Sequence, residues 1–449
     1  MTRLKRIGSC CALALLALVS VAQGGESQSR RERLANGATV IVRPVDGIDQ
    51  VAVIAAYSTG FVDEPADMTQ AAHLAEHLRC FGGEPGSFEK LNSIGRANAE
   101  TLPTFTYFDF TGPADQLGEA LRVEAARLRM TAPPRELILQ EAPRCYAETD
   151  AVERNPMGGM VKHAFMVLNQ AWQHGRRRGL VRGGLENFTS EQMHAYISAN
   201  FTPAQLTLVI VGGVNSDGAL AAAREVLGDI KLAAPQSAKT VWSRAARETT
   251  ITWDARPRAI CVAYEPPDDA DSRVVLTLFG NLLYGKLAQG SLSKEWGSAI
   301  FVSNQSWPVG RLPFFIYGAP SAQAQLAEAR NALEAGIDTS IAELVPVAAP
   351  QIRMMLEQMV LEQPLTKATI DRMAKALPRN AAQSPPGNAV NMIIGNAALQ
   401  MTMREMLFDH DVDGVAGRLR KLSADDIRAV LTKSFVAERR FITVIDAEK

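Results

Sequence analysis

The sequence is poor in cysteine, and it lacks both a long hydrophobic run and an excess of either charge. It contains 5 cysteines in 449 residues and has a formal net charge of −1. Only Cys80, Cys145 and Cys261 lie beyond the N-terminal segment, and a set this sparse and odd in number excludes a disulfide scaffold, although one bridge is compatible with an oxidising compartment. A charge near zero gives no sign of a nucleic-acid partner. With 47% hydrophobic and 21% charged residues, the composition is typical of a soluble globular protein.

The N-terminus has the pattern of a cleavable signal peptide. The stretch Arg3–Arg6 is basic, the apolar run Cys11–Val21 follows, and Ser20-Val21-Ala22 offers small residues for cleavage. The apolar run is too short to span a bilayer comfortably. We therefore predict that residues 1–22 are a bacterial signal peptide and that the mature chain is periplasmic, without a membrane span. Its removal changes the net charge from −1 to −4.

One short stretch carries the candidate chemistry. On a helix, His73 and His77 lie four residues apart, so both imidazoles project from one face and can hold one divalent metal ion. Glu76 lies beside them on that face and can take a proton from a metal-bound water without binding the ion. The order H-x-x-E-H reverses the commoner H-E-x-x-H order of zinc proteases. By themselves, two histidines and a glutamate on an Ala/Leu-rich helix are also compatible with solvated polar residues.

A second predicted helix, Arg135–Val152, supplies candidate carboxylates. Glu141 and Glu148 lie seven residues apart, which is two turns, so they share a face. Either could turn the histidine pair into a His2Glu catalytic site with an open fourth position, and the spacing alone does not choose between them. Cys145 lies one turn before Glu148, and Cys80 lies one turn beyond the second histidine. We expect two separate buried thiols there rather than a bridge.

Apolar and alternating runs predict the other elements of the first half. Val51–Tyr57 is apolar, which predicts a strand in a sheet covered on both faces. Thr189, with Gln192 three residues later, forms a capping box at the start of a predicted helix that ends at Phe201. Further strands are predicted at 39–43, 98–112 (a strand pair) and 206–212, and further helices from about residue 69 and at 117–129.

The chain is too long for one ordinary core, and its two halves resemble each other. Residues 185–210 align without gaps onto 419–444 at a constant offset of 234. The matching apolar positions and helix caps argue for an internal duplication, although convergent helix–strand patterning gives similar signs. We predict an N-terminal zinc-binding domain at 26–233, a linker at 234–247 and a homologous C-terminal domain without a metal site at 248–449.

Several motifs together carry a family resemblance. They are Leu34-Ala-Asn-Gly37, the loop Gly60…Asp63-Glu64, the stretch Ala72–His77, Asn98-Ala99, the helix Glu141…Glu148 and Asn155-Pro156. In these motifs the chain resembles the insulinase/pitrilysin family of zinc peptidases, especially short members such as the mitochondrial processing peptidase subunits. The resemblance extends from about Arg31 to the end and is strongest over residues 31–215. It implies an α+β inverzincin-type metallopeptidase fold of two homologous α/β-sandwich domains, each with a mixed, mainly antiparallel sheet and helices.

The resemblance also implies residue roles and a mode of substrate binding. The roles are Zn2+ ligation by His73, His77 and Glu148, general-base catalysis by Glu76 and support of the site by Glu141. Two chains, or one double-length chain, would enclose a chamber that admits unfolded peptides. The substrate would add as a strand to a sheet edge near Asn98-Ala99.

One departure from the family pattern lies in the second half. Active members usually carry an Arg and a Tyr seven residues apart there, and Ser293 and Ile300 hold these places here. We therefore predict a zinc endopeptidase subunit that is the catalytic member of a heterodimer, in which a homologous partner supplies the Arg–Tyr pair. In a homodimer, Arg311 or Tyr317 would have to substitute. The rival prediction is a non-catalytic assembly or peptide-binding subunit that retains the metal motif. We expect His410, the only histidine of the second half, to be an ordinary surface residue rather than a metal ligand.

Overall fold

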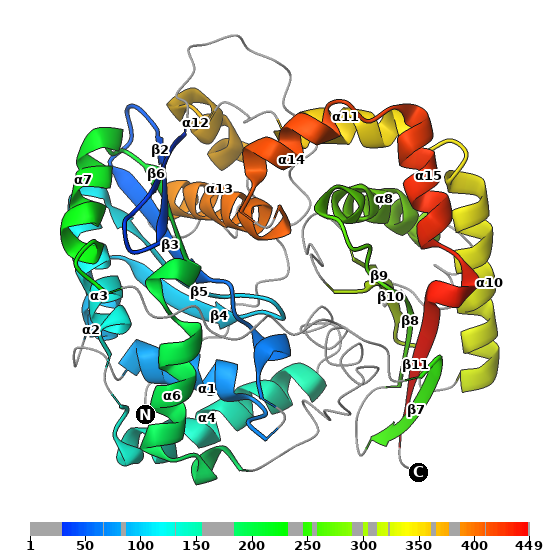
Figure 1. The fold of residues 1–449 in the computed structure, drawn as a ribbon, viewed down its shortest axis with the longest axis horizontal. Helices are drawn as coiled ribbons and strands as arrows, with labels where there is room; N and C mark the ends of the chain where they lie inside the picture. Colours follow the sequence, from blue (N-terminus) through cyan, green and yellow to red (C-terminus); the bar gives the residue numbers. More distant parts are fainter. Residues whose placement is uncertain are drawn as a thin grey trace.

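The computed structural model describes most of the chain beyond its N-terminus: residues 29–65, 67–81, 87–130, 132–154, 184–231, 246–253, 258–289, 300–303, 312–321, 324–360, 365–376, 387–408 and 410–447. The predicted signal peptide at 1–22 lies outside these residues, as do Ser293, Arg311, Asn155-Pro156 and nearly all of the linker predicted at 234–247. Among the described helices, none is long and apolar enough to cross a membrane. Two mixed sheets with many helices around them confirm the predicted fold class (Figure 1).

The first half of the chain forms a six-stranded sheet. Its order is β1-β2-β6-β3-β5-β4, in which β2 and β6 are parallel and all other neighbours are antiparallel. Strands β3 and β6 are buried almost throughout, as expected for apolar strands covered on both faces. Strand β4 is an edge strand. The strands are β1 (Arg30–Arg33), β2 (Thr39–Pro44), β3 (Gln50–Tyr57), β4 (Arg96–Thr101), β5 (Thr106–Pro113) and β6 (Leu206–Gly212).

The second half forms a five-stranded sheet with the same topology. Its order is β7-β11-β8-β10-β9, in which β7 and β11 are parallel and the other neighbours are antiparallel. This order matches β2-β6-β3-β5-β4 of the first sheet, strand for strand and direction for direction. The repeat supports the internal duplication predicted from the sequence. The strands are β7 (Glu248–Trp253), β8 (Ala259–Tyr264), β9 (Ile300–Val302), β10 (Phe314–Gly318) and β11 (Arg440–Ala447).

The repeated helix-to-strand units also begin alike. The predicted capping box is present: Thr189 accepts the backbone N–H of Gln192, whose side chain accepts the N–H of Thr189. Ser423 and Asp426 form the matching box in the second half. The helices are α1 (Ala71–Phe81), α2 (Ser87–Ile94), α3 (Leu117–Leu128), α4 (Arg135–Arg154), α6 (Ser190–Asn200), α7 (Ser216–Leu227), α8 (Ala270–Gln289), α10 (Leu326–Leu344), α11 (Ala349–Val360), α12 (Lys367–Ala376), α13 (Gly387–Leu407), α14 (Val412–Leu419) and α15 (Ala424–Ser434).

Helix α13 belongs to the second half in sequence but packs on the first sheet, across β3 and β6 (Figure 1). Its Ile394 forms one buried cluster with Ile54 of β3 and Val209 of β6. The opposite face of this sheet packs on a separate core with the helices that include α1. The second half is therefore not packed around its own sheet alone, and the domain limits 26–233 and 248–449 stay predictions.

Two polar contacts strengthen this link between distant segments. Arg31 Nη1 donates to both carboxylate oxygens of Glu405 at 2.6 Å. His410 Nε2 lies 2.9 Å from Ser58 Oγ, and its Nδ1 lies 3.3 Å from Thr207 Oγ1. The prediction that His410 is an ordinary surface residue is therefore wrong, because the fold of α13 onto the first sheet brings it against β6.

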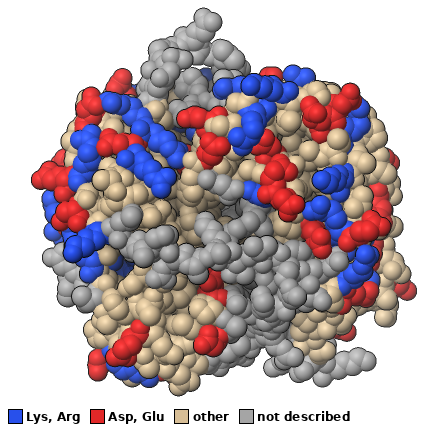
Figure 2. All heavy atoms as spheres, viewed as in Figure 1, with Lys and Arg blue, Asp and Glu red and all other residues tan. Residues whose placement is uncertain are grey.

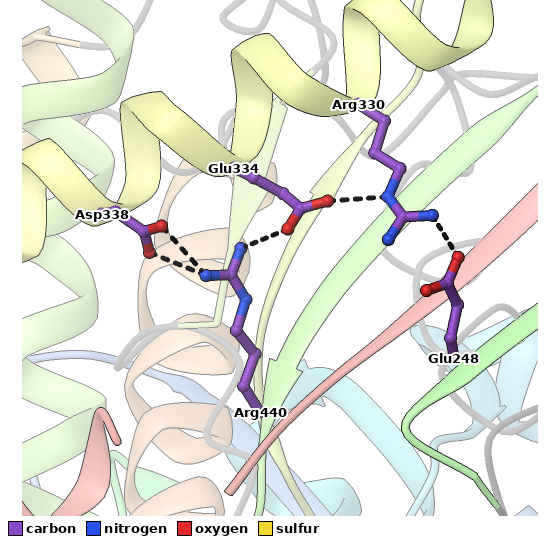
Figure 3. A network of polar contacts seen from close by, with 5 residues as sticks. All are labelled: Glu248, Arg330, Glu334, Asp338 and Arg440. Carbon is purple, nitrogen blue, oxygen red and sulfur yellow. Dashed lines mark hydrogen bonds and ion pairs between the residues drawn. The ribbon is translucent and has the colours of Figure 1, made fainter. Parts of the chain in front are cut away.

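Helix α10 is tied to the second sheet by a network of ion pairs (Figure 3). Glu334 accepts from Arg330 at 2.7 Å and from Arg440 of β11 at 2.9 Å. Arg440 also donates to Asp338 at 2.8 Å, and Arg330 pairs with Glu248 of β7. The side chains of Arg330, Glu334 and Arg440 are only 17–26% exposed, and their contacts with β7 and β11 fix how α10 lies along these two strands.

Charges of both signs mix on the molecular face drawn in Figure 2. Among the described residues, Lys and Arg are interspersed there with Asp and Glu, without one large patch of a single sign. The same balance appears in the net charge of −1.

Candidate metal and catalytic site

Helix α1 presents the histidine pair. Its N-terminus is capped by Glu64, whose carboxylate accepts the backbone N–H of Gln70 at 2.9 Å and that of Ala72 at 3.1 Å. A carboxylate at this position satisfies N–H groups that have no partner within the helix and interacts favourably with the helix dipole. The rings of His73 and His77 lie one turn apart, with centroids 4.9 Å apart and planes at 85°. The cap thus fixes the start of the helix whose first two turns carry the imidazoles of His73 and His77.

Glu148 of α4 meets the histidine pair. Its Oε2 lies 3.5 Å from Nε2 of His73 and 3.6 Å from Nε2 of His77. Ligand atoms about 2.0–2.1 Å from one tetrahedral ion lie about 3.4 Å from each other, so the two distances from Glu148 match those of ligands that share a Zn2+. The Glu148 side chain is 62% exposed, which leaves this side of the site open to solvent. The predicted ligands converge, and that they bind zinc stays a prediction.

Glu141 lies deeper than Glu148 and contacts the other nitrogen of His77. Its Oε2 is 3.1 Å from His77 Nδ1, and its Oε1 accepts from Arg144 at 2.7 Å. The Glu141 side chain is fully buried. An Nδ1–H that donates to this carboxylate leaves Nε2 free to bind a metal. Burial thus separates the two glutamates that the spacing could not: Glu148 contacts Nε2 of both histidines from the solvent side, and Glu141 contacts Nδ1 of His77 from the interior.

Protonation of the site follows from these contacts. Burial alone would lower the pKa of His77, but hydrogen bonds to Cys145 and Glu148, with the nearby charges of Cys145 and Glu76, outweigh burial and raise this pKa to about 11. Hydrogen bonds from His73 and His77 hold the pKa of Glu148 well below its usual range.

Glu76 lies on the same helix and is 8% exposed. Its Oε2 accepts a hydrogen bond of 2.6 Å from Thr101 Oγ1, at the end of the edge strand β4. On this strand Ala97 and Ala99 pack toward the core that includes α1, while Asn98 is exposed on the other face. The structure thus brings the predicted base beside the predicted substrate strand, and the roles of Glu76, Asn98 and Ala99 stay predictions.

A buried arginine anchors α1 from behind. The Arg79 guanidinium lies over the rings of both Tyr57 and Phe201, 4.6 and 4.5 Å from their centroids. It donates to the Tyr57 hydroxyl at 3.0 Å and pairs with buried Glu124 at 3.5 Å. Because the sequence shows Arg79 only as a charged residue on an apolar helix, its partners could not be foreseen.

Cys145 is the functional candidate that sequence reasoning did not assign. Its sulfur and one nitrogen each of His73 and His77 lie within 4.8 Å of one another. Cys80, Cys145 and Cys261 are all free and buried, so the expectation of separate thiols is confirmed. The available signal was the placement of Cys145 one turn before Glu148, on the helix face that is directed at the two histidines.

The second-half positions bear on the predicted Arg–Tyr pair. Ile300 of β9 is 4% exposed, and Tyr317 of β10 is completely buried. Tyr317 therefore does not present its hydroxyl to a substrate in this structure. Ser293 and Arg311 lie outside the described residues.

Comparisons with known proteins agree with this fold. Residues 187–348 match the family model described as the peptidase M16 inactive domain. A comparison with curated protein sequences found no match. A protease from Helicobacter pylori has a similar structure, with a TM-score of 0.68 and 16% identity over 94% of this chain and 99% of that one.

Two further structures show the same likeness. The periplasmic protease PqqL from Escherichia coli matches with a TM-score of 0.59 and 16% identity over 95% of this chain, which covers 48% of PqqL. A peptidase M16 inactive domain from Pseudomonas fluorescens matches with a TM-score of 0.60 and 15% identity over 94% of this chain and 99% of that one. The matched domain over residues 187–348 and the shared fold support the resemblance seen in the sequence to an insulinase/pitrilysin-like family, and the chain has the M16 peptidase fold.

Proposed function

We propose that the chain is a zinc-dependent endopeptidase subunit that hydrolyses peptides or unfolded segments. The observation that carries the proposal is the convergence of the Glu148 carboxylate on the imidazoles of His73 and His77, at 3.5 and 3.6 Å. A histidine pair with one carboxylate and an open position is the donor set of catalytic rather than structural zinc sites. Zinc, when bound there, supplies Lewis acidity that polarises a scissile carbonyl and makes water more acidic.

The residues of the chain perform the proton transfers. Glu76 accepts a proton from the attacking water and passes it to the leaving amine. The hydrogen bond from Thr101 holds one oxygen of this carboxylate and so limits its rotamers. Glu141 keeps the Nε2 atom of His77 directed at the ion through its contact with Nδ1.

The substrate strand adds at the side of β4 that no described strand occupies. Since β5 occupies only one side of β4, the backbone groups of the other side can pair with an extended peptide. Residues 97, 99 and 101 face the side of α1, so a strand added there passes the base with every second side chain directed at the metal residues. Extended segments satisfy this geometry and folded domains do not, which favours unfolded substrates.

The proposed assembly is a heterodimer in the periplasm that encloses a chamber. The N-terminal signal pattern and the periplasmic location of PqqL, a structural neighbour, support the compartment. The places of the Arg–Tyr pair are held by Ser293 and Ile300, and Tyr317 is buried, so a homologous partner is proposed to supply this pair.

The rival function is a non-catalytic assembly or peptide-binding subunit. The word "inactive" in the matched family description favours it. The match, however, spans residues 187–348, and the candidate metal site lies between residues 73 and 148, outside the matched segment. The description therefore concerns a part of the chain that holds none of the proposed ligands.

The decisive experiment is a peptide-cleavage assay with the purified chain, alone and with its homologous partner. We expect cleavage that a chelator abolishes and added zinc restores. Glu76→Gln should retain zinc and lower turnover by about 10²–10⁴-fold, the usual contribution of a general base. A protein that binds zinc but cleaves no peptide in either form, with or without its partner, would favour the non-catalytic rival.

A further inference from the structure

The metal site contains one more donor than a His2Glu site needs. The sulfur of Cys145 and a nitrogen of each histidine, His73 and His77, lie within 4.8 Å of one another. Glu148 approaches the same two imidazoles at 3.5 and 3.6 Å. The histidine pair therefore has two potential third ligands.

Both of these ligands come from one face of α4. Cys145 and Glu148 are three residues apart, so their side chains are neighbours on the helix surface. They differ in depth: Cys145 is completely buried, whereas the Glu148 side chain is 62% exposed. The thiol thus approaches the histidines from the protein interior and the carboxylate approaches them from the solvent side.

The distances allow the thiol to bind the same ion. Zinc–sulfur and zinc–nitrogen bonds of about 2.3 and 2.0–2.1 Å place tetrahedral ligand atoms about 3.6 Å apart. A shift of roughly an ångström at most therefore brings Sγ of Cys145 to bonding distance, which a side-chain rotation can supply. Cys145 forms no disulfide, and thiolate is a strong ligand for zinc and cobalt.

We propose that Cys145 is a reserve metal ligand that takes the place of Glu148 on the histidine pair. The thiol loses its proton to solvent as the sulfur–metal bond forms, and the carboxylate returns to water. The site then has two alternative ligand sets: the histidines with Glu148, which is open to solvent, and the histidines with Cys145, which is more buried. This inference rests on the proposed function only in requiring that His73 and His77 bind a divalent ion.

The test follows Co2+ binding by the full-length chain, because a cysteine ligand gives an intense near-ultraviolet sulfur-to-cobalt charge-transfer band. Glu148→Gln should retain one Co2+ and show this band. The band should vanish in Glu148→Gln/Cys145→Ser and persist in Glu148→Gln/Cys80→Ser, the matched control, since Cys80 is buried on α1 outside the donor group.

The outcomes separate this inference from the proposed function. If Glu148→Gln binds no Co2+, or binds it without the band, while the wild-type chain binds it, the reserve ligand is refuted and the His2Glu site stands. A wild-type chain that binds neither Co2+ nor Zn2+ refutes both. If the double variant does not fold, zinc X-ray absorption of Glu148→Gln decides, since a Zn–S distance of about 2.3 Å identifies the thiolate.

Discussion

Replacing Glu141 with glutamine separates metal binding from catalysis. The carboxylate is fully buried between His77 Nδ1, at 3.1 Å, and Arg144 Nη1, at 2.7 Å. Glutamine keeps the shape but removes the charge, and one end of its amide must offer N–H groups to Arg144 or to the imidazole. Loss of such a carboxylate–histidine contact weakens metal binding by about 10–100-fold, or about 1.4–2.7 kcal/mol. We expect a loss of this size in the zinc affinity of Glu141→Gln.

The assay is a zinc titration against a competing chelator, followed by peptide cleavage at saturating zinc. Glu136→Gln, on an exposed position of the same helix, is the matched control and should leave the affinity unchanged. Because Glu76 is intact, turnover at saturating zinc should fall much less than the affinity, the reverse of the pattern for Glu76→Gln. An affinity within about twofold of wild type would refute the argument that Glu141 orients His77.

Three further predictions concern stability and assembly. Arg79→Met leaves the carboxylate of Glu124 buried without one of its cationic partners and should cost about 3–5 kcal/mol in urea unfolding, whereas Arg122→Met, at an exposed pair, should cost no more than about 1 kcal/mol. Burial raises the pKa of Asp109 to about 6, so ionisation of this carboxyl above that pH destabilises the fold. Asp109→Asn should therefore stabilise the protein by up to about 3 kcal/mol at pH 7.5 and by progressively less toward pH 4. Urea unfolding at pH 7.5 and at pH 4 measures this difference. Adding a homologous partner that carries the Arg–Tyr pair should raise peptide cleavage by about 10²–10³-fold, and full activity of the chain alone would contradict the heterodimer.

Local structure could be predicted from the sequence wherever neighbouring residues decide it. Strand β6 spans Leu206–Gly212 as predicted, because a short, mostly apolar run rich in β-branched residues favours a buried strand. The Thr189 capping box is present because its two hydrogen bonds join residues three apart. Gly37, the last residue of the Leu34-Ala-Asn-Gly37 motif, lies between β1 and β2 and has a φ of 89°, which glycine adopts without strain.

The candidate site could be predicted only in part, because the sequence pattern does not show how deeply each side chain is buried. Helical spacing put Glu141 and Glu148 on one face, but only tertiary packing makes one fully buried and the other 62% exposed. The proximity of Cys145 to both histidines likewise depends on how closely α1 and α4 approach each other. Spacing along one helix determines which side chains project in the same direction. The distance from those side chains to a second helix depends on tertiary contacts that the sequence pattern does not contain.

The sequence pattern could not predict that α13 packs on the first sheet. This packing joins the two halves of the chain in one buried cluster. The apolar run of β3 required a cover on both faces of the first sheet, but any apolar helix satisfies that requirement. The fold uses α13 from the second half, and Arg31–Glu405 and His410–Ser58 add polar contacts beside it. The sheet that carries edge strand β4 is thus completed by residues far along the chain. The first half alone would expose Ile54 and Val209 to water, so the candidate site depends on the second half for stability even though every proposed ligand comes from the first.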